Sequence, residues 1–229
     1  MITSMKNTGI VIQARMGSTR LPGKVLMEFC GIPMILFQVG LLRKYNFGFD
    51  IVIATSTEEK DLEIVQLCKE NKLNYMTGSE KDVFNRYRKV IQEYRFDNII
   101  RLTADNPLVS YSIIDAAIKS HSKYDPDITS TRRLETDNNI TRYVPKGFSV
   151  DIIRSKALLA VAEHNLDDYQ REHVIPVFFN GQFKVNICKP RIDYLNDMSI
   201  DTYEEYLRIK RYAKRLLDDD KLLRYLGYE

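Results

Sequence analysis

Apolar residues follow two different spacings along the first half of this chain. Short runs of apolar and β-branched residues predict buried strands at residues 9–13, 50–55, 73–76 and 98–103. Between these runs, apolar residues recur every three or four positions and predict helices; in the first they are Ile35, Leu36, Val39 and Leu42. Repeated strand–helix units of this size predict an α/β domain with a mostly parallel central sheet, right-handed crossovers and helices on both faces.

Local signals mark where these helices begin. Pro33 favours the first position of a helix. Ser56 and Glu59 have the spacing of a capping box, and Ser112 is a candidate N-cap. The helix that follows Glu59 is expected to bury Leu62, Val65 and Cys68.

The second half of the chain is less regular. Its patterns predict strands at residues 127–131, 148–153 and 183–188, and helices at 156–164, within 167–179 and from 202 to 217. The last helix has an apolar stripe of Tyr206, Ile209, Ala213 and Leu216. Residues 132–145 are polar and predict a long loop, and such loops are often binding loops or lids. We therefore interpret residues 1–229 as one domain in which 132–146 is a candidate lid or acceptor loop.

Composition and charge narrow the classes of function. A chain of 229 residues with 44% hydrophobic residues fits one domain with a sizeable core. The net charge of +3 argues against nucleic acid as the main partner. Neither a membrane span nor the apolar segment of a signal peptide is evident. Cys30, Cys68 and Cys188 have neither zinc nor disulfide spacing, so we expect free thiols and a cytoplasmic protein.

A cation-rich loop follows the first predicted strand. Arg15, Arg20 and Lys24 fall within ten residues, with Gly17 and Ser18 between them. Glycine lets a backbone approach an anion closely, and successive amides can form an anion nest. Arginine grips phosphate oxygens with two donors, and lysine adds a point charge. The loop is a candidate phosphate site, with a solvated basic loop as the alternative, and it matches neither GxGxxG nor a Walker A loop.

A carboxylate is predicted at the same edge of the sheet. Asp105 directly follows the strand of residues 98–103, and Pro107 prevents that strand from continuing. Ligands of parallel α/β sheets bind at the carboxyl ends of strands, so Asp105 and the cation-rich loop are expected to converge. Asp105 is a candidate Mg²⁺ ligand, because magnesium favours one or two carboxylates together with water and substrate phosphates. An Asx turn before the proline is the structural alternative.

Residues 13–24, Gln-Ala-Arg-Met-Gly-Ser-Thr-Arg-Leu-Pro-Gly-Lys, closely resemble the signature loop of the cytidylyltransferases that activate sugar acids. That family includes the CMP-KDO and CMP-acylneuraminate synthetases, and the match is strongest to its SpsF spore-coat polysaccharide branch. The resemblance implies a GT-A-like nucleotidyltransferase fold, Mg²⁺ as cofactor, and transfer of CMP from CTP to a sugar acid with release of pyrophosphate. The implied nucleotide-binding residues are Gln13, Ala14, Arg15, Gly17, Ser18, Arg20, Lys24, Gly78 and Ser79; those implied as catalytic are Arg15, Lys24 and Asp105.

The same resemblance implies the metal ligands. Arg-Leu-Thr-Ala-Asp-Asn-Pro-Leu, which contains Asp105, is similar to the family's metal-bearing segment. Ser-Ile-Asp-Thr-Tyr-Glu-Glu-Tyr is similar to a family motif whose aspartate, here Asp201, is the second ligand and starts the last helix, although Tyr203 replaces the usual proline. Asp151 is the alternative partner for Asp105, because Ser149 stands where the family's Gly-Leu-Asp-Val-Glu segment has its aspartate.

Two further segments resemble family motifs. Thr-Gly-Ser-Glu-Lys-Asp-Val-Phe-Asn-Arg-Tyr, from residue 77, is similar to a segment beside the base and the acceptor. Backbone groups at Gly78 and Ser79 could contact a pyrimidine, and Ser79 could also cap a helix. Arg-Glu-His-Val, from residue 171, is similar to a segment for acceptor binding or dimer contacts, and a structural histidine is the alternative to a general base there. The candidate acceptor residues are Asp82, Arg86, Arg171 and His173.

The sequence leaves other functions open. One is a nucleotidyltransferase that uses another nucleotide or a phosphorylated acceptor. Another is a glycosyltransferase-like module that binds a nucleotide without turnover. Within the favoured interpretation, the enzyme acts in surface polysaccharide or glycan biosynthesis, with CTP and a sugar acid as small-molecule partners and a homodimer left open.

Overall fold

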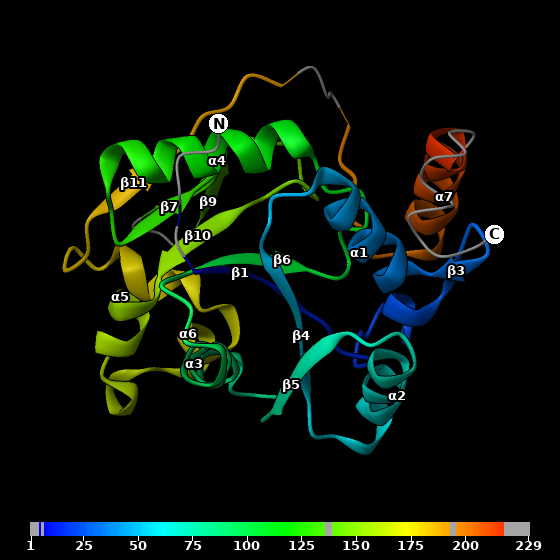
Figure 1. Cartoon of the computed structure of the whole chain (residues 1–229), viewed down its shortest axis with the longest axis horizontal. Helices are drawn as coiled ribbons and strands as arrows, with labels where there is room; N and C mark the ends of the chain where they lie inside the picture. Colours follow the sequence, from blue (N-terminus) through cyan, green and yellow to red (C-terminus); the bar gives the residue numbers. More distant parts are fainter. Residues whose placement is uncertain (1–4, 6, 136–138, 193–195, 218–229) are drawn as a thin grey trace.

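A seven-stranded sheet crosses the computed structural model, which describes residues 5, 7–135, 139–192 and 196–217 (Figure 1). Its strands, in spatial order, are β11 (Val185–Ile187), β7 (Ile128–Ser130), β10 (Asp151–Arg154), β6 (Asn98–Thr103), β1 (Thr8–Gln13), β4 (Asp50–Ser56) and β5 (Asn74–Gly78). Of these seven strands, β10 runs antiparallel to both of its neighbours and the other six share one direction. The predicted α/β fold with a mostly parallel sheet is confirmed.

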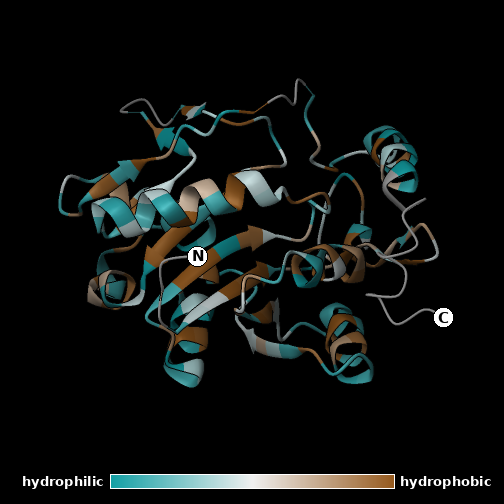
Figure 2. Cartoon of the chain, turned by 45° about the horizontal axis from the view of Figure 1, so that its top comes forward, coloured by the Kyte–Doolittle hydropathy of each residue, from teal (hydrophilic) through white to brown (hydrophobic). Residues whose placement is uncertain are grey.

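Helices cover both faces of this sheet (Figure 1). Ile10 and Ile12 of β1 belong to one core and Val11, between them, belongs to the other, as the two-residue period of a strand requires. Residues of the first core lie on α1 (Met34–Tyr45), α2 (Leu62–Glu70), α4 (Tyr111–Tyr124) and α7 (Tyr203–Leu217). Residues of the second core lie on α3 (Val83–Tyr94) and α5 (Ser155–Ala160). Figure 2 shows apolar residues gathered on the central strands.

The predicted capping box at Ser56 is wrong. Ser56 is the last residue of β4, and its hydroxyl donates to the carboxylate of Asp61. A 3₁₀ turn (Glu59–Asp61) follows, so α2 begins at Leu62. Leu62 is therefore 54% exposed and Ile64 is buried in its place, while Val65 and Cys68 are buried as predicted.

Two other predicted helix caps, Ser79 and Ser112, are also replaced by nearby residues. The cap of α3 is Asp82, whose carboxylate accepts a hydrogen bond from the amide of Asn85 at 2.9 Å. Ser79 instead accepts a hydrogen bond from the amide of Asp82. Ser110, rather than Ser112, precedes α4.

The helices predicted near residues 156–164 and 167–179 are interrupted. The first divides into α5 and a 3₁₀ turn (Glu163–Asn165), and the second into α6 (Asp168–His173) and a 3₁₀ turn (Ile175–Phe179). Val174, at the second break, has a φ of +65° that an α-helix cannot accommodate. In α7 the predicted residues Tyr206, Ile209 and Ala213 are buried, and the side chain of Leu216 lies outside the described residues.

Two short strands within the range 132–145 form a hairpin where a loop was predicted. β8 (Arg132–Leu134) pairs antiparallel with β9 (Ile140–Arg142), and residues 136–138 lie outside the described residues. Both strands are partly exposed, so they lack the apolar run that reveals a buried strand. A shorter hairpin of β2 (Glu28–Phe29) and β3 (Ile32–Pro33) precedes α1, so Pro33 lies just before the helix that it was predicted to begin. In the described ranges, no helix has the length and apolar character needed to cross a membrane.

Candidate active site

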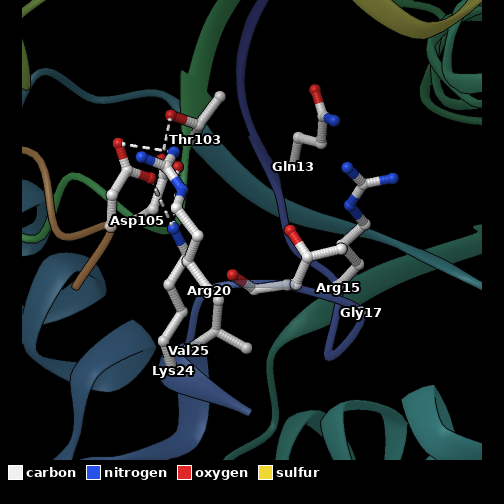
Figure 3. A pocket seen from close by; sticks show the side chains of 11 residues that line it. Gln13, Arg15, Gly17, Arg20, Lys24, Val25, Thr103 and Asp105 are labelled. Atoms are coloured by element: carbon white, nitrogen blue, oxygen red, sulfur yellow. Dashed lines mark hydrogen bonds and ion pairs between the residues drawn. The ribbon is translucent and has the colours of Figure 1, made fainter. Parts of the chain in front are cut away.

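A cavity of about 250 Å³ lies at the carboxyl ends of β1 and β6 (Figure 3). Its walls come from the loop after β1, the end of β6 and the segment before α7. The lining residues are Gln13, Arg15, Gly17, Ser18, Thr19, Arg20, Lys24, Val25, Thr103, Asp105 and Asp201. The cation-rich loop therefore shares one cavity with both carboxylates implied as metal ligands. Ala14 is buried and anchors the loop, because its amide donates to the carbonyl of Ala54 on β4.

The loop is held in shape by backbone hydrogen bonds. The carbonyl of Met16 accepts from the amide of Gly23 at 3.0 Å, and the amide of Met16 donates to the carboxylate of Asp61 at 2.7 Å. Gly23 adopts a left-handed φ of +69°, which favours glycine. A 3₁₀ turn (Lys24–Leu26) follows immediately. This geometry brings Lys24 back toward the sheet.

Lys24 is the most enclosed cation of the cavity, with 7% of its surface exposed. Its ammonium lies 2.6 Å from the carbonyl oxygen of Ile200, 3.3 Å from Asp105 Oδ2 and 3.2 Å from Asp201 Oδ1. One ammonium thus bridges two carboxylates that stand 96 residues apart in the sequence. Asp105 and Asp201 converge on a common point, as expected for residues at one edge of the sheet.

Asp105 is positioned from two sides. Thr103, the last residue of β6, donates its hydroxyl to Asp105 Oδ1 at 2.6 Å (Figure 3). The carbonyl of Asp105 accepts a hydrogen bond from the amide of Ile200 at 2.9 Å. This backbone bond ties the end of β6 to the segment that carries Asp201.

Asp201 is surrounded by cations. Its Oδ2 atom lies 3.0 Å from Arg20 Nη2 and 2.5 Å from Lys146 Nζ, while Oδ1 faces Lys24. Burial raises the pKa of Asp201, but hydrogen bonds from Lys146 and Lys24 outweigh that effect and hold the pKa at about 2. Asp201 is therefore ionised across the physiological range.

Asp201 does not cap α7. Thr202 Oγ1 accepts from the amide of Glu205, and Glu205 Oε2 accepts from the amides of Asp201 and Thr202. These reciprocal bonds satisfy the start of the helix. The carboxylate of Asp201 is consequently directed to the cations and not to the helix.

Lys146 was missed by sequence reasoning. It lies just before Gly147, whose φ is +102°. A Cβ atom at Gly147 would approach the Met198 carbonyl carbon to 2.4 Å, so only glycine allows the two segments to meet this closely. That contact brings Lys146 to Asp201. In the sequence, the only sign of this was a lysine directly before a glycine.

Arg15 and the segment around residue 171 meet on another wall. Arg15 Nη2 lies 3.1 Å from Glu172 Oε1 on α6. Arg171 pairs instead with Asp82 at 2.7 Å, which joins α6 to the start of α3. The candidate acceptor residues Arg171 and Asp82 are therefore engaged with each other.

Gly78 and Ser79 belong to a segment that borders the cation-rich loop, but neither is among the described residues that line the cavity. A Cβ atom at Gly17 would come within 2.7 Å of Glu80 Oε1, so the two segments are in close contact. A Cβ atom at Gly78 would lie 2.7 Å from Arg86 Cγ. Arg86 itself is 1% exposed and donates to the carbonyl of Ala54, which makes it a buried support and not a cavity residue.

Comparison with known proteins settles the family. The family model for cytidylyltransferases matches residues 9–225. The chain belongs to the cytidylyltransferase family. It is 31% identical over 217 residues to the spore coat polysaccharide biosynthesis protein SpsF of Bacillus subtilis, covering 90% of this chain and 86% of that protein. The resemblance to this family and to its SpsF branch is confirmed, and the chain is an enzyme of the nucleotidyltransferase class.

Solved structures agree with this assignment. A cytidylyltransferase from Leptospira borgpetersenii aligns with a TM-score of 0.78 and 26% identity, covering 97% of this chain and 98% of that one. A CMP:2-keto-3-deoxy-manno-octonic acid synthetase complexed with CTP aligns with a TM-score of 0.70 at 16% identity, covering 92% and 100%. The second likeness is one of fold.

In this cytidylyltransferase, Asp151 does not join the cavity of Asp105. It is 1% exposed on β10, and its carboxylate contacts Arg132 Nη2 at 2.6 Å, Arg101 Nη1 at 3.3 Å and the hydroxyl of Ser130 at 2.6 Å. Burial raises the pKa of Asp151, but the arginine charges prevail and hold the pKa below its usual value. Asp201, not Asp151, is the carboxylate that converges with Asp105.

A second, smaller cavity of the cytidylyltransferase lies beside this ion pair. It measures about 90 Å³, and its walls come from the hairpin, α6 and the sheet. The lining residues are Arg101, Arg132, Leu134, Ile140, Tyr169, His173, Ile175 and Pro176. Arg101 Nη2 lies 3.2 Å from Gln13 Oε1, so one hydrogen bond links the two cavities. Of the candidate acceptor residues, His173 is the one that reaches this cavity.

Proposed function

We propose that this cytidylyltransferase transfers CMP from CTP to a sugar acid and releases pyrophosphate, in the biosynthesis of a surface polysaccharide or glycan. The observation that carries the proposal is the cavity in which one loop supplies three cations and Lys24 bridges Asp105 and Asp201. Phosphoryl transfer needs cations where charge develops on the phosphate oxygens. The match of residues 9–225 to the cytidylyltransferase family supports the choice of CTP.

The loop is the proposed site of the triphosphate. Arg15 and Arg20 line the cavity with partly exposed guanidinium groups that can each grip phosphate oxygens with two donors. Lys24, at the start of the 3₁₀ turn, lines the same cavity. Gln13, Gly17 and Ser18 line the same wall, while the buried Ala14 anchors the loop to β4. Gly78 and Ser79, beside the loop, remain proposed contacts for the base.

Magnesium is the proposed cofactor, and the residues present fit it. Two carboxylates, Asp105 and Asp201, already hold one cation between them. The described residues contain no group of three or more His, Cys, Asp or Glu side chains that could hold a metal ion, but Mg²⁺ needs only one or two carboxylates when phosphates and water complete the shell. Bound there, the ion would supply positive charge against the α-phosphate.

In the proposed reaction, an acceptor oxygen attacks the α-phosphorus in line. A phosphorus–oxygen bond forms to the acceptor, whose hydroxyl proton passes to solvent, and the bond to the leaving pyrophosphate breaks. Arg15 and Lys24 neutralise charge on the departing phosphates, while Asp105 and Asp201 orient the cations around the α-phosphate. The contribution of this chain is thus positioning and electrostatic preorganisation.

The second cavity is the proposed acceptor site. Arg101 and Arg132 both pair with Asp151, so the ion pairs that the described residues form at this wall carry a net positive charge. Nε of Arg101 is buried and, among the described residues, has no hydrogen-bond partner. An anionic group of the acceptor would balance this positive charge and accept a hydrogen bond from Arg101 Nε. The Gln13–Arg101 hydrogen bond puts this site beside the triphosphate loop, which supports an acidic sugar as the acceptor.

Pyrophosphate release tests the proposal. CTP, ATP, GTP and UTP are each mixed with Mg²⁺ and the enzyme, with and without 2-keto-3-deoxy sugar acids. We expect release that requires both CTP and a sugar acid. Release with another nucleotide would reject the base assignment, and release only with a sugar phosphate would reject the acceptor class. Binding of nucleotide without release for any acceptor would favour a non-catalytic module.

A further inference from the structure

Lys24 occupies the point where Asp105 and Asp201, the two proposed metal ligands, meet. Its ammonium contacts Asp105 Oδ2, Asp201 Oδ1 and the carbonyl of Ile200 within 3.3 Å. The second oxygen of Asp105 accepts the hydroxyl of Thr103, and the second oxygen of Asp201 accepts Arg20 and Lys146. Every carboxylate oxygen of the pair is therefore already satisfied by the protein.

The charges of this cluster oppose entry of a metal ion. Three cationic groups, from Arg20, Lys24 and Lys146, surround two carboxylates. A divalent ion placed between the carboxylates would lie within a few ångströms of the Lys24 ammonium, and like charges at such a distance repel strongly in a partly buried site. The ion can bind well only if Lys24 leaves.

The cavity itself provides a destination for Lys24. The lysine lines the same cavity as Arg15 and the loop amides, where the triphosphate is proposed to bind. A phosphate chain there offers the ammonium a new anionic partner, and a lysine side chain has enough rotatable bonds to turn between the two positions.

We propose that Lys24 is an internal counter-ion that keeps the metal site closed until nucleotide phosphates draw its ammonium away from Asp105 and Asp201. Nucleotide and metal binding are then coupled through one side chain, and the metal alone binds weakly. This inference rests on the proposed function, because it takes the triphosphate to enter the Arg15–Lys24 loop.

Binding of Mn²⁺ alone to the full chain, followed by electron paramagnetic resonance, tests the closed state. We expect weak binding by the wild type and about tenfold tighter binding by Lys24→Gln, a coupling of ordinary allosteric size. Lys24→Arg keeps the charge and should stay weak. Lys119→Gln removes a lysine that pairs with Asp115 on α4, away from the cavity, and should match the wild type. Adding Asp105→Asn to Lys24→Gln should abolish the gain.

Equal affinities of the wild type and Lys24→Gln would overturn the proposal. If Lys24→Gln does not fold, tight Mn²⁺ binding by the wild type or by Lys24→Arg would overturn it just as well. No nucleotide is present in this assay, so its result is independent of whether CTP is the substrate.

The release of Lys24 has its own readout. In ¹⁵N-lysine-labelled enzyme, the Lys24 ammonium signal is assigned by its loss in the Lys24→Arg variant. Addition of CTP in EDTA should shift that signal, because the ammonium changes its anionic partner. An unchanged Lys24 signal in enzyme that binds CTP would overturn the transfer, whereas absence of CTP binding would instead reject the proposed function.

Discussion

The two cavities of this cytidylyltransferase are built in different ways. Most of the first cavity, the proposed triphosphate site, comes from residues 13–25, completed by the end of β6 and the segment before α7. The Arg101–Arg132 cavity draws on β6, the hairpin of β8 and β9, α6 and the turn after it. A site within one contiguous loop leaves a motif in the sequence, whereas a site assembled from four elements does not. The proposed nucleotide site is therefore local in the sequence, whereas the proposed acceptor site exists only once the fold has assembled it.

The largest expected effect falls on the first cavity. Asp105→Asn preserves the shape of the side chain, with its Nδ2 donating to Thr103 Oγ1 where the carboxylate accepted, but it removes the charge, so turnover should drop about 100- to 1000-fold, the cost of losing a preorganised electrostatic group. The melting temperature should change little. Steady-state kinetics with matched thermal denaturation measures both. Asp115→Asn, at a carboxylate on α4 paired with Lys119, is the control, and a variant that turns over normally would remove Asp105 from the mechanism.

The loop cations should discriminate between tri- and monophosphates. Arg15→Ala removes a charge-assisted contact and should weaken CTP binding by about 1.5–3 kcal/mol. CMP should lose less, because its single phosphate meets fewer of these groups. Calorimetric titration with both ligands measures the difference, with Arg43→Ala on the exposed side of α1 as control. Equal losses for CMP and CTP would show that Arg15 does not contact the outer phosphates.

Acid should erase the stabilisation of Asp201. The pKa of Asp201 is about 2 in the folded protein, below the ordinary 3.8. At pH values above 3.8 the ionised carboxylate therefore stabilises the fold by about 2 kcal/mol, and this stabilisation is lost as the pH falls toward 2. The difference in free energy of unfolding between wild type and Asp201→Asn should therefore shrink from about pH 5 to about pH 2. Urea unfolding at a series of pH values measures it. A difference that does not vary with pH would mean that the cations do not depress this pKa.

The Arg101–Arg132 cavity should affect the acceptor alone. Arg132→Lys keeps a charge beside Asp151 but loses the planar pair of donors, so the KM of the acceptor should rise about tenfold while that of CTP stays within about twofold. Arg133→Lys is the matched control, because the neighbouring arginine is largely exposed and pairs only with Glu135 among the described residues. If the KM values of CTP and of the acceptor rose equally, the two cavities would have to act as one functional site.

The smallest expected effect separates structure from chemistry at the start of α7. Thr202→Ala removes the hydroxyl that accepts from Glu205 and should lower the free energy of unfolding by about 1 kcal/mol. Turnover should stay within about twofold of the wild type, because Asp201 keeps its own contacts. Chemical denaturation and kinetics on the same preparation test this. A large loss of turnover would show that the cap also positions the carboxylate.

Sequence reasoning succeeded where signals were local. Apolar runs predicted the buried strands of residues 9–13 and 98–103. Because ligands of parallel sheets bind at the carboxyl ends of strands, Asp105 was then expected beside the loop. Asp201 was found only through a family resemblance, because a carboxylate before a helix resembles an N-cap. Thr202 and Glu205 supply that cap instead, and no single position in the sequence distinguishes the two arrangements.

Non-local features escaped prediction for physical reasons. The hairpin of β8 and β9 is partly exposed, so its residues carry no apolar period. Lys146 reaches Asp201 through the close approach of Gly147 to Met198, a contact between segments about fifty residues apart. Arg101 looks in sequence like an interruption of a buried strand, and only the antiparallel pairing of β6 with β10 reveals Asp151 as its partner.

We propose that the two cavities together transfer CMP to an acidic sugar, and ³¹P NMR of one reaction tests this directly. Enzyme, Mg²⁺, CTP and a 2-keto-3-deoxy sugar acid are mixed, and the phosphorus signals are followed. We expect the three CTP signals to decay while pyrophosphate and one new phosphodiester form in equal molar amounts. Unchanged CTP with every sugar acid tested, or conversion to CMP without a phosphodiester, would contradict it.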